Sequence, residues 1–424
     1  MITRCLNLDW LEVHCLEPAS LAPRNPDYFR ACGFEVSVRD YGTRVYEEMF
    51  VIYEPNTEEP MIEVRRKPVG AKNPLAFQVL DPLSCHIRLT NRSCYYQHPA
   101  YFLFSFLVQH QYSIMRISRI DLALDFEKFD TGYDPQDVIN RFLQHKYSKI
   151  NQGEIAAHGK DLWDGRFWNS LKWGSPKSMI STKLYNKTLE LKEKKDKPYI
   201  RQAWAVAGLV DDFITLEKKR EDGTTYNPTI WRLEFSITSS VKKWFVIEDY
   251  NTNHRKIRSI HNTLDEYFSD QQVLNIFASL VHHYFHFKKV QRDKNGNLVR
   301  KDRCDDVQLF RFKEQAQFFK VERPASAKPS SRLDDSLKRK ILAYKQTLTK
   351  QDIIKACDTI LADLDNRHIV NAATQRWNQT ELTLLRQLIS IRMKSHDQPL
   401  GQTIEEIKGL LQLEESMFGE VDEP

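Results

Sequence analysis

Two segments of the chain alternate strictly between apolar and polar residues, which is the pattern of strands with one buried face. Residues 119–126 place Arg119, Asp121 and Asp125 opposite four apolar side chains. Residues 230–237 likewise place Arg232 and Glu234 opposite an apolar face. We therefore expect two core strands that expose carboxylates on their polar faces.

A third alternating segment, residues 182–187, lies between these two in the sequence. Its period of two places Lys183, Tyr185 and Lys187 on one face, so that a phenol is flanked by two ammonium groups. An ordinary tyrosine has a pKa near ~10, and neighbouring positive charges favour the phenolate and attract a phosphodiester. The segment indicates an activated tyrosine nucleophile, although the same pattern is also common on exposed strands.

The carboxylates of the alternating strands are candidate metal ligands. Residues two apart on a strand are separated by roughly 7 Å at the backbone, close enough for both side chains to reach one divalent cation. The candidates are Asp121, Asp125 and Glu234, and oxygen ligands favour Mg²⁺ or Mn²⁺. The alternative is that these residues are solvated, because antiparallel sheets commonly have one wet face.

The rest of the first 290 residues predicts an α+β fold with a predominantly antiparallel sheet. Strands are expected at residues 6–16, 43–53, 60–66, 77–80 and 86–90, and helices at 99–112, from Asp134 onward and at 271–287. Residues 8–13, 44–46 and 62–64 contain an aspartate, a tyrosine and a glutamate, in the same order as the later strands. This echo indicates either a duplicated strand unit, with the first half as a scaffold copy, or a chance resemblance.

Composition shifts divide the chain into three parts. Residues 1–290 are expected to form the catalytic domain, and residues 291–332 a basic hairpin followed by a linker. Residues 333–424 predict a helical accessory domain with an acidic tail. Its candidate partners are origin DNA, a helicase and a second copy of the chain, as in a homodimer.

Composition places few limits on function. The net charge of +5 is compatible with a DNA partner without requiring one. Seven cysteines without a Cys-x-x-Cys pair indicate neither a disulfide framework nor a zinc ribbon. The longest apolar run is far short of the ~20 residues that span a bilayer, and no leader pattern is evident. We expect a cytoplasmic protein with no membrane contact.

Aromatic and cationic residues interleave in residues 153–173, including Lys172 and Trp173. This mixture suits stacking on unpaired bases together with phosphate contacts, as single-stranded DNA requires. The alternative is that the tryptophans pack in the core.

Four blocks of sequence, taken in their order along the chain, resemble the replication initiation factor family. This family comprises the Rep-trans type initiators of rolling-circle plasmids and related relaxases of integrative conjugative elements. The blocks are Arg-Ile-Asp-Leu-Ala-Leu-Asp-Phe at 119–126, Trp-Gly-Ser-Pro-Lys-Ser at 173–178, Leu-Tyr-Asn-Lys at 184–187 with Glu190, and Arg-Leu-Glu at 232–234. The resemblance covers about residues 1–290 and lies in the order of the blocks, since each alone is a weak motif.

The resemblance implies that Tyr185 attacks a phosphodiester at an origin, leaving a 5′-phosphotyrosine and a free 3′-hydroxyl. Lys183, Lys187 and Arg232 are then expected to interact with the phosphate. Alternatively, Arg232 pairs with Glu234. The expected DNA-binding residues are Arg119, Lys172, Trp173, Gly174, Ser175 and Lys177.

Other functions are not excluded by the sequence. No His-hydrophobe-His metal pair is evident, and His282, His283 and His286 lie in a segment with helical spacing that predicts partner-facing or solvated residues. Pro176 fixes one backbone angle in the glycine-serine turn, which departs from the family pattern. The alternatives are a relaxase with the same chemistry, a non-catalytic origin-binding protein on the same scaffold, and a hydrolytic nuclease that uses water.

Overall fold

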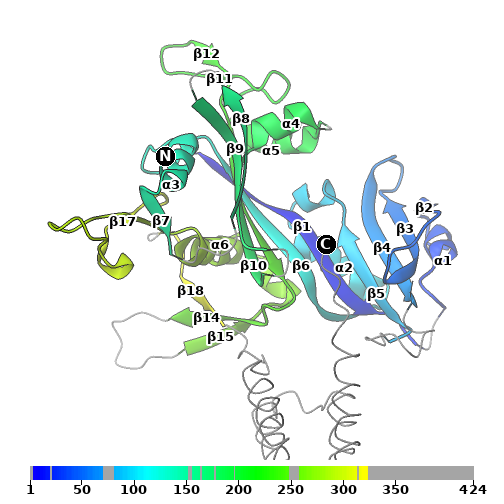
Figure 1. The fold of residues 1–424 in the computed structure, drawn as a ribbon. Helices are drawn as coiled ribbons and strands as arrows, with labels where there is room; N and C mark the ends of the chain where they lie inside the picture. Colours follow the sequence, from blue (N-terminus) through cyan, green and yellow to red (C-terminus); the bar gives the residue numbers. More distant parts are fainter. Residues whose placement is uncertain are drawn as a thin grey trace, which may run out of the picture. The chain divides into compact units, whose positions relative to one another are not determined.

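The structure, a computed structural model, describes most of the first 322 residues (Figure 1). The described ranges are 3–19, 22–69, 81–150, 155–162, 165–175, 178–194, 196–247, 257–312 and 315–322. The chain divides into two units, Met1–Ala325 and Ser326–Pro424, and every described residue belongs to the first. The expected strand at 77–80 and the expected helical domain at 333–424 lie outside the described residues.

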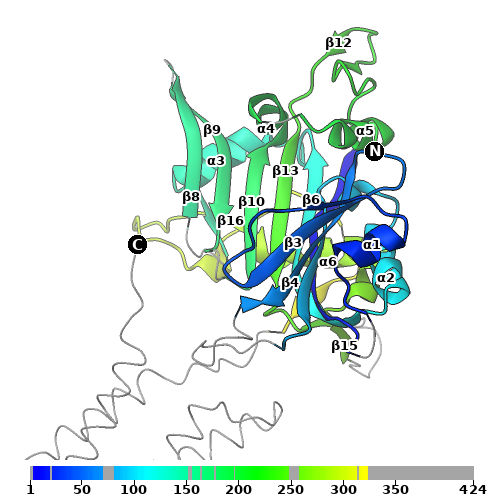
Figure 2. The ribbon, with the colours of Figure 1, turned by 90° about the vertical axis from the view of Figure 1, so that its right-hand side faces the viewer.

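A large antiparallel sheet organises this unit, as the alternating segments predict (Figures 1 and 2). Within the described residues ten strands pair in the order β2-β3-β4-β5-β1-β6-β13-β10-β9-β8. Their bounds are β1 Arg4–Leu16, β2 Val36–Val38, β3 Tyr46–Tyr53, β4 Pro60–Pro68, β5 Ser84–Leu89, β6 Ser113–Phe126, β8 Ile155–Leu162, β9 Gly165–Trp173, β10 Ile180–Asn186 and β13 Trp231–Thr238. The α+β class with a predominantly antiparallel sheet is therefore confirmed.

The sheet consists of two halves with the same strand order. In each half the first strand of the chain, β1 or β6, lies at the centre, and the following four are arranged from the outer edge inward. The two central strands pair with each other antiparallel. A repeated strand unit is thus present in the topology, but the sequence echo aligned the wrong strands. Tyr46 lies on β3 and Glu63 on β4, which correspond to β9 and β10 rather than to β10 and β13.

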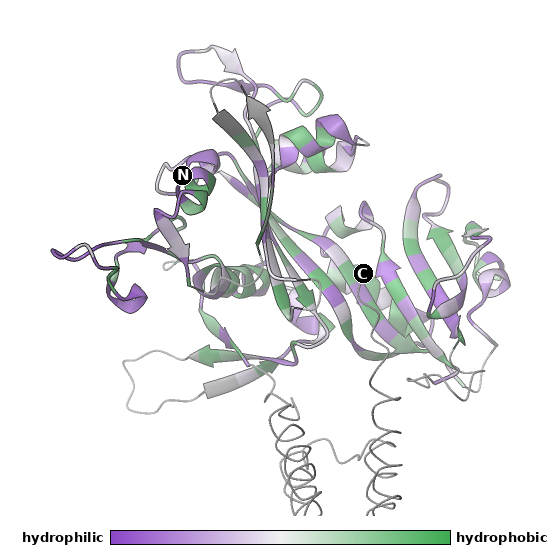
Figure 3. Ribbon diagram, viewed as in Figure 1, coloured by the Kyte–Doolittle hydropathy of each residue, from purple (hydrophilic) through white to green (hydrophobic). Residues whose placement is uncertain are grey.

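Helices cover the apolar face of the sheet through aromatic contacts. They are α1 (Pro26–Ala31), α2 (Pro99–Gln109), α3 (Pro135–Leu143) and α6 (Asp270–Tyr284). In the second half, Phe235 of β13 meets Phe277 of α6, with ring centroids 5.3 Å apart. The Asp134 side chain accepts a hydrogen bond from the Gln136 amide and caps α3, as the sequence predicts. Green and purple alternate along the strands in Figure 3, which shows the two-residue period directly.

An insertion between β10 and β13 carries α4 (Lys187–Glu193), α5 (Pro198–Val206) and the short hairpin β11 (Lys218–Lys219) and β12 (Thr225–Tyr226). Since Trp204 of α5 bonds to Asp125, this insertion lies over the polar face at one end of the sheet. It places the Trp204 side chain above Asp125 of β6.

Two small sheets complete the unit. They have the orders β15-β14-β18 and β17-β16-β7. Their bounds are β7 Tyr147–Lys149, β14 Lys243–Ile247, β15 Ile257–His261, β16 Phe287–Lys289, β17 Asp306–Val307 and β18 Phe319–Val321. Because β17 and β18 pair with earlier strands and bury Val307 and Phe319, the unit continues past the domain boundary expected at residue 290.

Two global expectations concern membranes and thiols. None of the helices in the described ranges is long and apolar enough to cross a membrane. The cysteines in those ranges are all free thiols.

Candidate active site

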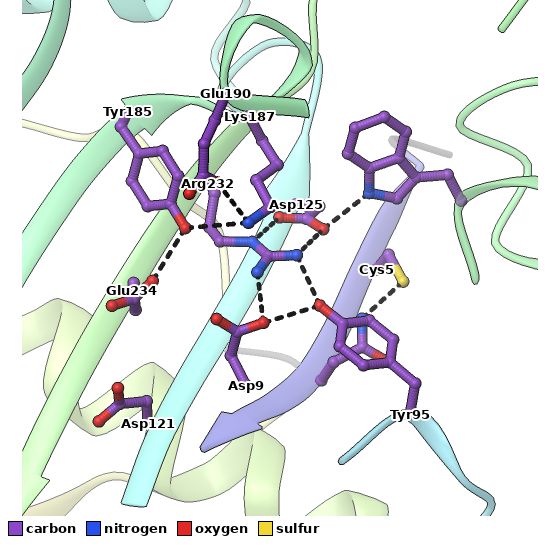
Figure 4. Close-up of polar contacts among 12 residues, drawn as sticks. Cys5, Asp9, Tyr95, Asp121, Asp125, Tyr185, Lys187, Glu190, Arg232 and Glu234 are labelled. Atoms are coloured by element: carbon purple, nitrogen blue, oxygen red, sulfur yellow. Dashed lines mark hydrogen bonds and ion pairs between the residues drawn. The ribbon is translucent and has the colours of Figure 1, made fainter. Parts of the chain in front are cut away.

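A buried arginine connects three strands on the polar face of the sheet (Figure 4). Arg232 of β13 is fully buried and donates two hydrogen bonds of 2.6 Å to Asp125 of β6. It also donates to Asp9 of β1 at 2.6 Å and to the Tyr95 hydroxyl at 2.7 Å. Trp204 donates to the second oxygen of Asp125 at 2.7 Å. This network fixes the centre of the sheet beneath the candidate nucleophile.

The network corrects two sequence-based expectations. Arg232 pairs with Asp125 and Asp9 rather than with Glu234, and its burial separates it from any phosphate at the surface. Asp125 is also fully buried, with both oxygens engaged, and Asp121 is only 3% exposed. The two carboxylates of β6 are therefore covered rather than exposed on a wet face.

Asp9 was not among the residues predicted from the sequence. The pairing of β1 with β6 shifts register between Leu8 and Trp10, so that a β-bulge places both Asp9 and Trp10 on the polar face. The signal in the sequence is the three-residue spacing from Leu8 to Leu11, which breaks the period of two. Burial favours a raised pKa for Asp9, but Arg232 and Lys187 outweigh burial and lower the pKa to about 2.

Tyr185 lies at the edge of this network on β10. Its hydroxyl donates to Glu234 Oε2 at 3.0 Å, and Lys187 Nζ donates to the same hydroxyl at 3.4 Å. Lys187 also donates to Glu190 at 2.5 Å. On the other side, the Lys183 ammonium group lies 4.0 Å from the centre of the Tyr185 ring. The structure therefore brings together the predicted tyrosine, both predicted lysines and one predicted carboxylate, and Figure 4 shows Glu190 and Glu234 on either side of the hydroxyl.

The electrostatics of Tyr185 differ from the expectation. Tyr185 is only 5% exposed. Burial raises the pKa of its hydroxyl well above the ordinary value, and the nearby Glu234 raises it further despite Arg232. The flanking lysines therefore do not produce a phenolate in the free protein, and a proton acceptor is needed.

Glu234 is the nearest such acceptor. Burial, followed by repulsion from Asp9 and Asp121, raises the pKa of Glu234 to about 7. Burial likewise raises the pKa of Asp121, although Arg119 binds that carboxylate through two hydrogen bonds of 2.9 and 2.5 Å. Asp9, Asp121 and Glu234 thus concentrate negative charge in one region beside Tyr185.

The predicted metal set does not form a closed cluster. Across the described ranges, no group of three or more His, Cys, Asp or Glu residues is arranged to hold a metal ion. Asp125 is tied to Arg232 and Trp204, and Asp121 is bound by Arg119. Asp121 lies on the same face as Glu234, which is opposite Ala123. Mg²⁺ is often held by one or two carboxylates together with water and substrate phosphates, so a partial site of this kind fits its chemistry.

The predicted DNA-binding residues fall in different environments. Trp173 is 2% exposed and packs against Phe142 and Phe287, so the alternative of core packing is the correct one. Lys172 lies opposite Lys183 on the polar face. Arg119 is bound to Asp121 and Ser236, with a side chain that is 42% exposed.

The glycine-serine turn connects β9 to β10. Gly174 has φ +93°, and an added Cβ would lie 3.2 Å from the Ser178 hydroxyl, so this position requires glycine. The Ser175 amide donates to that hydroxyl at 3.0 Å. Pro176 and Lys177 lie outside the described residues.

The histidine segment lies at the end of α6, away from this site. His286 is hydrogen-bonded to Asp306 at 2.6 Å, and burial and His282 lower the pKa of His283. These contacts are structural, and within the described chain they build no metal cluster.

No family model matches the chain, and no curated protein matches it in sequence. Among solved structures, the chain is similar to a rolling circle replication initiator protein from Geobacillus stearothermophilus. The two are 13% identical, with a TM-score of 0.42 over 72% of this chain and 93% of that chain. The function proposed below rests on the side chains of the site and on the order of the sequence blocks.

Proposed function

We propose that this protein is a DNA nicking and strand-transfer enzyme of the rolling-circle initiator type, with Tyr185 as its nucleophile. The observation that carries the proposal is the bonding of the Tyr185 hydroxyl, which donates to Glu234 and accepts from Lys187. A tyrosine placed between a proton acceptor and a cation is suited to covalent catalysis on a phosphodiester.

In the proposed reaction, the Tyr185 oxygen attacks the phosphorus atom and its proton passes to Glu234. The bond from phosphorus to the 3′-oxygen breaks, and that oxygen takes a proton from solvent. The products are a 5′-phosphotyrosine and a free 3′-hydroxyl, so the energy of the phosphodiester is conserved and the strand can later be rejoined.

Lys183 and Lys187 provide the positive charge for the phosphate. Both ammonium groups lie beside the Tyr185 ring, at 4.0 and 5.4 Å from its centre. Tyr185 is nearly buried, and the Lys187 side chain is only 1% exposed and paired with Glu190. We therefore expect entering DNA to displace Lys183 and to meet Lys187 only when Tyr185 itself becomes accessible. Arg232 acts as a positioning residue, since it holds β1, β6 and β13 together beneath the tyrosine.

A divalent cation, Mg²⁺ or Mn²⁺, would be held by Asp121 and Glu234, with Asp9 adjacent. The reason is the concentration of negative charge at these three carboxylates, which adds to burial in raising the pKa of Glu234 to about 7 and which a bound cation relieves. Such an ion polarises the phosphate and stabilises the leaving oxygen.

The test is covalent capture of labelled DNA. The wild type and Tyr185→Phe are incubated with Mn²⁺ and 3′-end-labelled single-stranded DNA that carries the origin of the native element, and the products are separated on a denaturing gel. Label that migrates with the wild type but not with the variant supports the proposal. Cleavage without an adduct indicates a hydrolytic nuclease, and binding without cleavage indicates an origin-binding protein.

A further inference from the structure

The polar face of the sheet continues from Tyr185 into the N-terminal half, where its chemistry changes. In the repeated topology, β4 and β5 correspond to β10 and β13, but they carry no tyrosine. Cationic and aromatic side chains take the place of the catalytic groups. We name this region the indole-arginine face, and it consists of Trp10, Arg65, His86, Arg88, Arg116 and Arg119.

Trp10 is the centre of this face. The β-bulge that exposes Asp9 also places Trp10 there, directly opposite Asp121. The Arg88 guanidinium lies 4.1 Å from the centre of the indole ring, and the Arg119 guanidinium lies 4.5 Å from it. An arginine stacked on an indole is held in place and keeps donors available at its rim.

On this face the acidic side chains are more deeply buried than the side chains that bind them. The acidic side chains of Glu12 and Glu63 are 11% and 7% exposed. The side chains of Arg65 and His86, which bind them, are 23% and 25% exposed. The carboxylates therefore lie beneath the Arg65 guanidinium and the His86 ring and orient them, and Arg65 brings positive charge to the layer that meets solvent.

More positive charge follows along β6. Arg116 lies opposite His14, and burial, His86 and Arg116 together lower the pKa of His14 to about 4. Burial and Arg116 likewise lower the pKa of Lys242, which is exposed beside it. Cations thus extend from the candidate active site across the N-terminal half.

Arg119 connects the two halves. In the described structure its hydrogen bonds use only Nε and Nη2, directed at Asp121 and Ser236. A guanidinium has five N–H donors, so Nη1 remains for a ligand. Three strand spacings separate β10 from β1, and Trp10 lies opposite Asp121, four residues along β6 from the Asp125 level of Tyr185, so the two residues are roughly 19 Å apart on the sheet.

We propose that the indole-arginine face binds the single-stranded DNA that flanks the scissile phosphate, with guanidinium planes stacking on bases and their donors holding phosphates. This proposal rests on the proposed function for its substrate. Bases of single strands stack on aromatic rings and on arginine planes, and a cationic surface follows the backbone. A strand that reaches Tyr185 along this face is held on one side of the nick before and after cleavage.

The test measures DNA binding without cleavage. Tyr185→Phe protein in EDTA is titrated into a fluorescein-labelled oligothymidine of about 20 nucleotides, and anisotropy gives Kd at about 50 and 200 mM salt. Arg119→Gln and Arg88→Gln are each expected to weaken binding roughly tenfold. Each is also expected to reduce the salt slope by about 0.7. Arg119→Lys is expected to restore the slope but not the full affinity, because lysine keeps the charge and loses the plane.

The matched control is Arg220→Gln. Arg220 also lies over an aromatic ring, 4.6 Å from the centre of Tyr226, but on the β11–β12 hairpin outside the large sheet. This variant is expected to bind like the parent. Trp10→Phe, which retains an aromatic ring, tests the indole with the least disturbance, and circular dichroism verifies that each variant is folded.

Equal affinity and equal salt slope in Arg119→Gln, Arg88→Gln and Arg220→Gln would overturn the proposal and leave an internal ion-pair network. Binding of a matched duplex more tightly than the single strand would overturn it as well. The adduct assay on the same variants, with Tyr185 restored, separates this result from the proposed function. Unchanged binding in the variants together with an adduct from the wild type refutes only the indole-arginine face, whereas weakened binding in the variants with no adduct from the wild type refutes only the nicking chemistry.

Discussion

At the scale of single residues, chemistry at Tyr185 depends on where its proton goes. We predict that Glu234→Gln lowers the rate of adduct formation by about 10²- to 10⁴-fold, because glutamine accepts the hydrogen bond but cannot take the proton. The pKa of Glu234 is raised to about 7, and only the carboxylate form is a base. Because the proposed cation lowers this pKa when it binds, the wild-type rate with metal is expected to rise with pH and to level off below about pH 7. Single-turnover rates between about pH 5.5 and 8.5 measure both effects.

The control for this change is Glu127→Gln. Glu127 accepts hydrogen bonds of 3.1 and 3.2 Å from the Tyr226 hydroxyl, a similar pair outside the site. Its replacement is expected to leave both the rate and the pH profile unchanged. A Glu234→Gln enzyme with the wild-type profile would exclude Glu234 as the proton acceptor.

The metal proposal makes a second residue-scale prediction. In Tyr185→Phe protein bound to single-stranded DNA, Asp121→Asn and Glu234→Gln are each expected to weaken Mn²⁺ binding by more than about tenfold. Electron paramagnetic resonance of free Mn²⁺ measures the affinity without any turnover. Glu190→Gln is the control, because Glu190 binds Lys187 on the other side of the tyrosine. Equal affinity in all four proteins would place the metal elsewhere.

At the scale of elements, a buried hydrogen bond from Trp204 attaches α5 to the sheet. Trp204 is fully buried and donates to Asp125, so Trp204→Phe removes a donor from a buried carboxylate. We predict a loss of about 1–3 kcal/mol from the missing hydrogen bond, in addition to the lost packing. Urea unfolding measures the total. Trp173→Phe is the control, since that indole nitrogen is buried with no hydrogen-bond partner in the described structure, and a loss equal to the control would contradict the prediction.

The strands that carry the site could be predicted from the sequence, but one bulge could not. Alternation is local, so β6, β10 and β13 were identified together with the polar faces that hold Tyr185 and Glu234. A bulge depends on the partner strand, and for this reason Asp9 was missed. Burial of the polar face was also unpredictable, because α5 and Tyr95 cover it from distant parts of the sequence.

At the scale of the whole unit, the central pairing of β1 with β6 joins the two halves into one sheet. One apolar core cluster includes residues of both halves, such as Phe50 and Phe235. We therefore predict that the halves unfold together. In hydrogen-exchange mass spectrometry of the full chain, peptides from β4 and β10 should lose protection at the same urea concentration. Earlier loss in one half would show that the halves are independent.

The strand order itself could not be predicted, because it is set by pairing between residues far apart in the sequence. The sequence echo predicted a repeat but aligned β3 and β4 with strands one position away from their topological equivalents. Short matches of this kind contain no information on which strands are neighbours. The repeat became visible only when both halves showed the same order around β1 and β6.

The most direct test of the central claim is to identify the residue that carries the DNA. The wild-type adduct is digested with nuclease and trypsin, and mass spectrometry locates the phosphorylated peptide. With 17 tyrosines in the chain, the position is informative. We predict phosphotyrosine at Tyr185 and at no other residue. A phosphate on another residue, or cleaved DNA with no phosphorylated peptide, would contradict the account.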